Sequence, residues 1–280
     1  MSVLLAAFLP QANQPRRAVD LEAADCSGHQ SSWSGLRTAY GTQRTSVPAG
    51  GTLDVRPEDN GGVQVVHGKG STYAITACIA AGARTIEEAQ RAVAAVRIVV
   101  EGSHVTTTGG GADQKASVQL IIEAPGDAHI QARTANGPIG FEDVAGTFTA
   151  DASNGPISLR NVRGTATVRA HNGPISIQGS AGTIDAQASN GPIDVTLEGT
   201  EWNGKLDARS VNGPLSVTVP DGFRSGVEIS SSSHSPWSCR LAECRSISGD
   251  RDYDSGRTLR LGRDPITVRV STNNGPVAVQ

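Results

Sequence analysis

Asn-Gly-Pro followed by an aliphatic residue occurs six times in this 280-residue chain. The first four copies lie 18 residues apart, and the next two follow after gaps of 22 and 62 residues. So short and regular a period, in segments with strand-like alternation, is typical of a solenoid in which each repeat makes one turn. The motifs begin at Asn136, Asn154, Asn172, Asn190, Asn212 and Asn274.

Each repeat contains two strand patterns. Apolar residues stand three and five positions after the Asn, as in Ile157 and Leu159, with a small or polar residue such as Ser158 between them. This period of two predicts a strand with one buried face. A second alternating segment follows a glycine ten positions after the Asn, as at Gly164, and the 22-residue copy fits if four residues are inserted before Gly204. We therefore predict an all-β fold, a single-stranded parallel β-solenoid with coils of about 18 residues and one short α-helix.

The Asn-Gly-Pro segments are expected to form the corners between strands. Asn and Gly tolerate positive φ, and Pro is accepted at the first residue of a strand. Corners one coil apart should stack their asparagine amides in a hydrogen-bonded ladder. Asn-Gly hairpins in an antiparallel sandwich are the alternative, but they would not repeat one pattern at a fixed period. The predicted structural turn ladder is Asn136, Asn154, Asn172, Asn190, Asn212 and Asn274.

One helix is predicted within residues 85–96. Thr85 and Glu88 have the spacing of a capping box, and the segment carries an apolar stripe. We expect this helix to cover an open end of the solenoid or to pack beside it, because an uncovered sheet edge invites aggregation. The stripe consists of Ile86, Ala89, Val93 and Val96.

The chain is expected to divide into four segments. The first is a truncated signal peptide or a disordered N-terminus, since it has an apolar run without a basic segment before it. An N-terminal β segment with a first coil at Asn60 and the helix comes next, followed by the regular coils. Irregular coils with a cysteine loop, continuous with the solenoid, complete the chain. The corresponding ranges are 1–20, 21–125, 126–221 and 222–280.

Four cysteines, an even number, agree with an exported and oxidised protein. Cys239 and Cys244 are predicted to form a disulfide, because they enclose a short loop where the coil period fails. Cys26 and Cys78 are then left to pair across 52 residues. The alternative is that all four are reduced in a cytoplasmic protein.

Charge and motif content exclude several functions. The net charge is −3 with dispersed Lys and Arg, which argues against nucleic-acid binding, and no later apolar run has the length of a membrane span. No cofactor is predicted. The carboxylates of segment 250–256 alternate, but Gly256 and Leu261 do not fit an EF-hand calcium loop.

The segments Ile122–Gly126 and Val217–Gly222, together with the Asn-Gly-Pro-Ile turns and the early coil followed by a helix, resemble the bacterial putative-adhesin family of β-solenoid domains. The resemblance covers residues 45–280. It implies an exported, periplasmic or surface-associated protein and carries no catalytic residues.

We therefore expect an exported, non-enzymatic, adhesin-like module that binds a cell-wall polymer, a polysaccharide or another surface protein. A carbohydrate-active β-helix enzyme, a lyase or hydrolase, is one alternative, but it needs clustered carboxylates, and Asp185 and Asp207 are the single adjacent pair in the predicted outward columns. A structural module that self-assembles through the solenoid ends is another. The two columns are Asp151, Arg169, Gln187 and Arg209, and Thr149, Thr167, Asp185 and Asp207.

Overall fold

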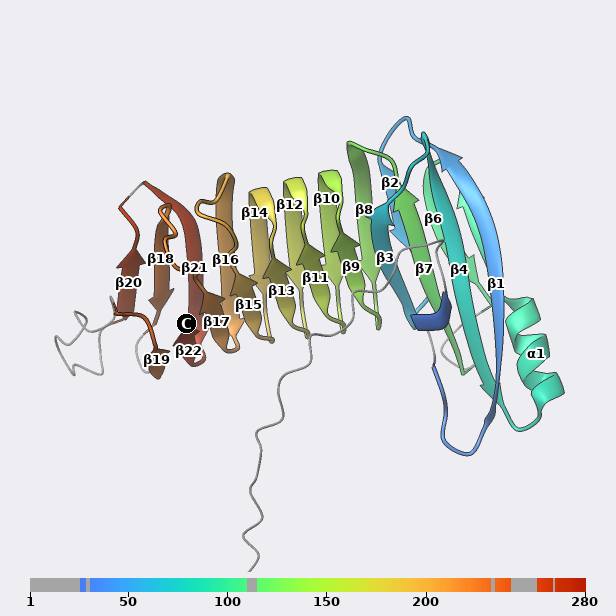
Figure 1. Ribbon diagram of the computed structural model, residues 1–280. Helices are drawn as coiled ribbons and strands as arrows, with labels where there is room; N and C mark the ends of the chain where they lie inside the picture. Colours follow the sequence, from blue (N-terminus) through green and yellow to red (C-terminus); the bar gives the residue numbers. More distant parts are fainter. Residues whose placement is uncertain (1–25, 29–30, 110–114, 233–234, 243–255, 264) are drawn as a thin grey trace, which may run out of the picture.

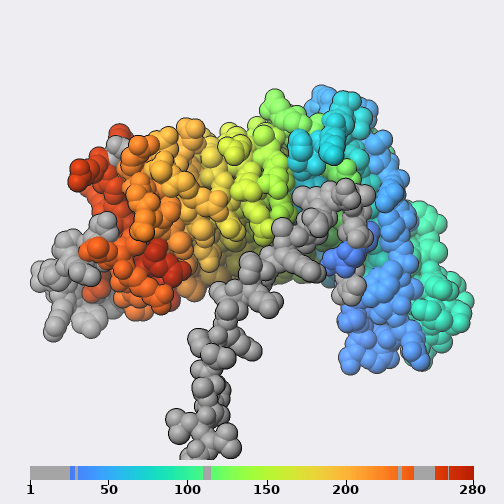
Figure 2. Space-filling model, viewed as in Figure 1, coloured from blue at the N-terminus to red at the C-terminus, as the bar shows by residue number. Residues whose placement is uncertain are grey.

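The computed structural model describes residues 26–28, 31–109, 115–232, 235–242, 256–263 and 265–280. These residues form two mixed sheets of 11 strands each, one α-helix and the short 3-10 helix η1 (Cys26–Gly28). The strands stack along one long axis, and Figure 2 shows the successive repeats as bands along an elongated body (Figures 1 and 2).

Sheet A contains the strand that follows each Asn-Gly-Pro corner. Its order is β1 (Arg37–Pro48), β4 (Thr72–Ala83), β7 (Ala116–Ala124), β3 (Gly61–His67), β9 (Ile139–Glu142), β11 (Ile157–Arg160), β13 (Ile175–Gln178), β15 (Ile193–Thr196), β17 (Leu215–Thr218), β22 (Val277–Val279) and β19 (Trp237–Cys239).

Sheet B contains the second strand of each repeat. Its order is β20 (Arg257–Leu261), β18 (Gly226–Ser231), β21 (Ile266–Asn274), β16 (Gly204–Asn212), β14 (Ala181–Ala188), β12 (Arg163–Ala170), β10 (Ala145–Ala152), β8 (Ala128–Thr134), β2 (Leu53–Arg56), β6 (His104–Thr108) and β5 (Arg97–Glu101).

In the middle of both sheets the strands are parallel and the register equals one sequence repeat. Ile157 lies beside Ile139 on one side and Ile175 on the other, and Val168 lies beside Ala150 and Ala186 in the same way. The inserted residues of the long repeat do not disturb this register, because Gly204 lies beside Gly182 as predicted. Equivalent residues therefore stack in columns along the long axis.

The core lies between the two sheets and is filled by columns of apolar side chains, one residue from each strand. Ile157, Ile175 and Ile193 are buried, while Ser158 and Ser176 are exposed, so the predicted alternation is confirmed at these positions. Phe141 and Phe148 are the bulkiest side chains of the repeats, and their ring centroids are 4.9 Å apart. Most other core side chains are Ala, Val, Ile or Leu, which are smaller than the two phenylalanines and let the two sheets lie close together.

The prediction that the corners need positive φ was wrong. Neither the Asn nor the Gly of the motif has positive φ. The glycine is required by close stacking instead: a Cβ on Gly173 would lie 2.1 Å from the carbonyl oxygen of Gly155, and a Cβ on Gly191 would lie 2.1 Å from that of Gly173. Consecutive corners thus approach so closely that no side chain fits between them.

Gly173→Ala should consequently lower the free energy of unfolding by about 3 kcal/mol, at the upper end of the usual cost of overpacking, because the obstacle is backbone. Gly126→Ala is the matched control, since a Cβ there meets nothing within 4 Å and its φ is not positive. Urea unfolding of both variants measures the difference. Equal stabilities would contradict the steric explanation.

The C-terminal end differs from the predicted series of longer coils. β21 pairs in parallel with β16, and β22 pairs in parallel with β17, so the last corner lies directly on the fifth despite the 62 residues between them. The intervening chain runs beyond this coil as β18, β19 and β20, with β20 antiparallel to β18. Trp202, within the insertion before Gly204, is buried and donates Nε1–H to the carbonyl of Gly182 at 3.0 Å.

The N-terminal end is not part of an all-parallel stack. β3 pairs in parallel with β9, as expected for an early coil, but β1–β4 and β4–β7 are antiparallel pairs, as is β5–β6. β4 is buried on both faces. Its inner residues Ala77 and Ile79 join the core, and its outer face is covered at Cys78 and Gly82 by Cys26 and Trp33.

Helix α1 (Ile86–Ala95) begins with the predicted capping box, in which Thr85 accepts from the Glu88 N–H and the Glu88 carboxylate accepts from the Thr85 N–H. It packs against β1 and β4 at the end of sheet A (Figure 1). Ala89 and Val96 are buried as predicted, whereas Ile86 is 40% exposed and does not belong to the packed stripe. The close contact of Val93 with Gly41 explains why β1 carries a glycine there.

A disulfide joins Cys26 to Cys78, with Cα atoms 5.4 Å apart, so this pairing is confirmed. Cys244 and the first 20 residues lie outside the described residues, as does most of segment 250–256; the Cys239–Cys244 bridge and the signal peptide stay predictions. Among the described helices, none has the length and apolarity that crossing a membrane requires.

Candidate binding surface

The six asparagines of the corners form a continuous row of side-chain hydrogen bonds. Each of the last five donates its Nδ2–H to the Oδ1 of the preceding asparagine, and all six are exposed. The five distances, in order from the Asn154–Asn136 pair to the Asn274–Asn212 pair, are 3.0, 2.9, 3.1, 3.0 and 2.9 Å. The row fixes the corners in register, and it uses one N–H donor and one acceptor of each inner amide.

Asn172→Ala should lower the free energy of unfolding by about 1–2 kcal/mol, because it removes one bond to Asn154 and one from Asn190. Ser158→Ala on the exposed face of β11 is the control and should change stability by less than about 0.5 kcal/mol. Thermal unfolding of the two variants makes the comparison. An Asn172→Ala variant as stable as the control would show that water replaces the two hydrogen bonds without a loss of stability.

The outer face of sheet B carries regular rows of polar side chains along the repeats. Between β8 and β16 its side chains form three columns, each with one residue per strand. The first column is mostly threonine. The middle column has an amide and hydroxyl groups on β8, β10 and β12 and carboxylates on β14 and β16, and the third column is rich in arginine. In order from β8 to β16 the columns are His129, Thr147, Thr165, Thr183 and Lys205; Gln131, Thr149, Thr167, Asp185 and Asp207; and Arg133, Asp151, Arg169, Gln187 and Arg209.

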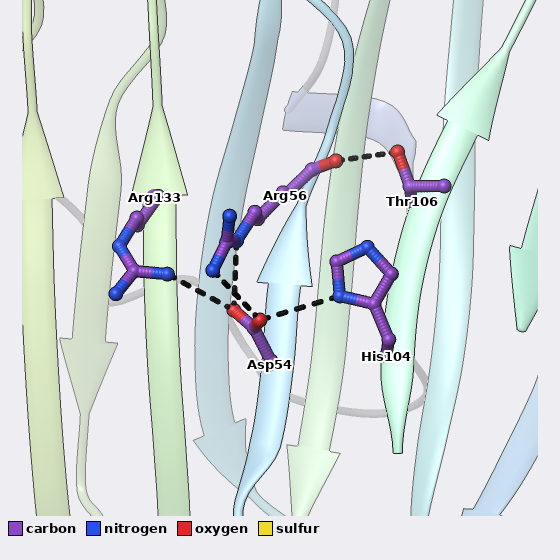
Figure 3. Close-up of polar contacts among 5 residues, drawn as sticks. All are labelled: Asp54, Arg56, His104, Thr106 and Arg133. Carbon is purple, nitrogen blue, oxygen red and sulfur yellow. Dashed lines mark hydrogen bonds and ion pairs between the residues drawn. The ribbon is translucent and has the colours of Figure 1, made fainter. Parts of the chain in front are cut away.

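At one end of this face Asp54 is surrounded by three basic groups (Figure 3). Its carboxylate lies 3.0 Å from Arg56 Nη2, 3.3 Å from His104 Nδ1 and 3.5 Å from Arg133 Nη1. These residues come from β2, β6 and β8, and Thr106 Oγ1 donates to the carbonyl of Arg56 at 2.7 Å. One carboxylate facing two guanidinium groups leaves positive charge at this end of the surface. Sequence spacing gave no signal for this cluster, since the strands are far apart in the chain.

At the other end Arg209 binds Asp207 through two hydrogen bonds of 2.8 Å. This contact lowers the pKa of Asp207 below its usual value of 3.8, against a smaller opposing effect of burial. Asp194, on the outer face of sheet A, has its pKa raised by burial, and its neighbours are Ser176 and Ser216.

The lowered pKa of Asp207 predicts a pH-dependent stability. Because the folded pKa lies below the unfolded one, the contribution is fully present above the unfolded value of 3.8 and is lost as pH falls through the folded value. Arg209→Gln should therefore destabilise the protein more at pH 6 than at pH 2. Arg163→Gln, at an exposed position on β12, is the control. Urea unfolding at the two pH values measures the effect. A midpoint that Arg209→Gln lowers by the same amount at both pH values would contradict this linkage.

Two carboxylates on this face are neighbours. Asp185 and Asp207 lie side by side, as predicted, and the lowered pKa of Asp207 does not suit the role of a general acid, which needs a raised pKa. Within the described parts of the chain, His, Cys, Asp and Glu do not gather in a group of three that could hold a metal. A cavity of about 480 Å3 lies elsewhere, lined by residues that include Trp33, Asn60 and Ser117, and the sequence did not indicate it.

Comparison with known proteins adds little. No protein family matches the chain, and no curated protein matches it, so membership of the bacterial putative-adhesin family stays a prediction. Among solved structures, a putative cell adhesion protein from Clostridium sporogenes is similar over 86% of this chain and 99% of its own, with 8% sequence identity and a TM-score of 0.30.

Proposed function

We propose that this protein is an exported, non-enzymatic, adhesin-like binding module whose repeats form a parallel β-solenoid, and whose ligand is an extended polysaccharide held along the outer face of sheet B. The observation that carries the proposal is the register of the parallel strands, which places one polar side chain per strand in each of three columns. A ligand with a repeating unit meets the same contacts at each step along such a face.

The side chains of this face and the disulfide also support the proposed function. Exposed hydroxyl, amide and charged side chains offer both donors and acceptors, which is what a chain of sugar hydroxyls requires. The Cys26–Cys78 disulfide supports export, because disulfides persist in oxidising compartments.

A panel of immobilised polysaccharides tests binding, with a reducing-sugar assay on the same samples. Binding without release of reducing ends is the expected result. Release that increases with time and is abolished by Asp207→Asn would instead establish the carbohydrate-active enzyme.

Self-assembly through the ends has one observation in its favour: β19 and β20 are the last strands of their sheets among the described residues. Strands at a sheet edge present unpaired backbone groups to another chain. Sedimentation at several protein concentrations tests this function, and a mass that does not change with concentration would exclude it.

A further inference from the structure

One column of sheet B is rich in arginine in a chain whose net charge is −3. Arg133, Asp151, Arg169, Gln187 and Arg209 lie on successive strands of this column. Arg56 continues it on β2, because Val55 lies beside Ala132 in the parallel β2–β8 pair. Four arginines thus share the column with one carboxylate, and the surface has a charge pattern that a ligand would have to match.

Two arginines of the column, Arg133 and Arg169, have N–H donors left for a ligand. Arg169 is exposed, and its side chain makes no hydrogen bond or ion pair with any other described residue. The Arg133 side chain is 36% exposed, and its buried Nη1 lies 3.5 Å from Asp54 Oδ1, so the remaining N–H groups of the guanidinium are the ones that a ligand would meet. A guanidinium group with unused N–H donors is well suited to a carboxylate, which it binds through two parallel hydrogen bonds.

The spacing of these groups restricts the ligand. Neighbouring strands are about 4.8 Å apart, so Arg133 and Arg169, two strands apart, present positive charge at intervals of about 10 Å along the axis. Asp151 lies between them and is exposed. An anionic group placed at every strand would meet the Asp151 carboxylate, whereas a neutral sugar there would donate a hydroxyl to it. The neighbouring threonine column supplies further neutral hydrogen bonds.

Nucleic acid fits this face poorly. Phosphates of one DNA strand follow each other every ~3.4 Å, far more densely than the arginines. Single-stranded nucleic acid also binds through aromatic side chains on which bases stack, and the three columns contain no Phe, Tyr or Trp.

We propose that the ligand is an acidic polysaccharide in which carboxylate-bearing and neutral sugars alternate, with its chain along the long axis and its carboxylates over Arg133 and Arg169. This assignment rests on the proposed binding function and adds the charge and the repeat of the polymer. Arg133 and Arg169 are the anion contacts, and Asp151 selects the neutral sugar between them.

The test compares three polymers of similar length by isothermal titration: hyaluronan, in which uronate alternates with a neutral sugar, polygalacturonate, in which every sugar is charged, and neutral dextran. Hyaluronan should bind best. Arg169→Gln should weaken its binding about tenfold, the value expected from one charged hydrogen-bonded contact. Arg163→Gln removes the same charge six residues earlier on the same strand and should change affinity by less than about twofold. Asp151→Asn should improve the binding of polygalacturonate.

The outcomes separate this inference from the function on which it rests. Equal binding of dextran and hyaluronan would overturn the acidic ligand and leave the polysaccharide module standing. Equal losses for Arg163→Gln and Arg169→Gln would overturn the column in favour of diffuse electrostatic attraction. The opposite result is that polygalacturonate binds better than hyaluronan, with an affinity that Asp151→Asn does not change. That result would overturn the proposed alternation of charged and neutral sugars. Binding of none of a broad polysaccharide panel would overturn the proposed function itself.

Discussion

Ile175→Ala is expected to lower the free energy of unfolding by about 2–5 kcal/mol, the usual cost of truncating a large aliphatic side chain in a packed core. Ile175 is fully buried, and its neighbours in the column, Ile157 and Ile193, belong to the coils on either side. Those neighbours are held in place by the backbone pairing of β13 with β11 and β15, so the cavity has little freedom to close.

Ser176→Ala is the matched control for this experiment. Ser176 is the next residue on the same strand, faces solvent and should tolerate the change with an effect below about 0.5 kcal/mol. Urea unfolding followed by circular dichroism gives both values. Equal stabilities for the two variants would show that the assignment of inner and outer faces is wrong.

The regular part of the fold could be predicted because each repeat of the sequence carries the same strand and corner pattern. Alternation identifies the buried face, and the common period identifies which strands lie side by side. The four-residue insertion before Gly204 was recognisable because the next apolar residues return to the same columns. The corner was predicted in place but not in mechanism, since the contact that requires Gly173 is with the coil below it, not with its own turn.

The two ends of the fold could not be predicted in the same way. Spacing along the chain suggested that the residues between Asn212 and Asn274 form further coils, yet the hydrogen bond between these two asparagines is 2.9 Å. The sixth motif was itself a signal for this contact, because an asparagine in the ladder needs a partner. At the other end, the antiparallel strands of sheet A pair without any repeat that would have indicated their order.

The candidate surface was likewise predictable in its repeated part and not at its end. The columns of Arg169 and Thr167 followed from the period, so their place on the outer face of sheet B was expected. The cluster around Asp54 depends on strands β2, β6 and β8, whose adjacency no motif indicates. Charged contacts of this kind are set by tertiary pairing and have no local sequence pattern.

The second large effect is expected from the disulfide at the N-terminal end. Cys26→Ala should lower the free energy of unfolding by about 4 kcal/mol, because the bridge joins residues 52 positions apart and its loss frees that loop in the unfolded chain. The folded state also loses an anchor, since the bridge holds the chain before β1 against the outer face of β4. Cys78 is buried and remains as a small apolar side chain, so no cavity is added at that position.

Thermal and urea unfolding of the wild type and Cys26→Ala, both without reductant, measure this effect and leave the Cys239 region in the same state in both proteins. Ser34→Ala, at a nearby exposed position, is the control and should match the wild type. A Cys26→Ala variant as stable as the wild type would show that the loop is already ordered in the unfolded chain or that the bridge is absent from the purified protein, and free-thiol titration under denaturing conditions distinguishes the two. Presence of the bridge in protein recovered from the periplasm or medium would, in turn, support the exported state on which the proposed binding function depends.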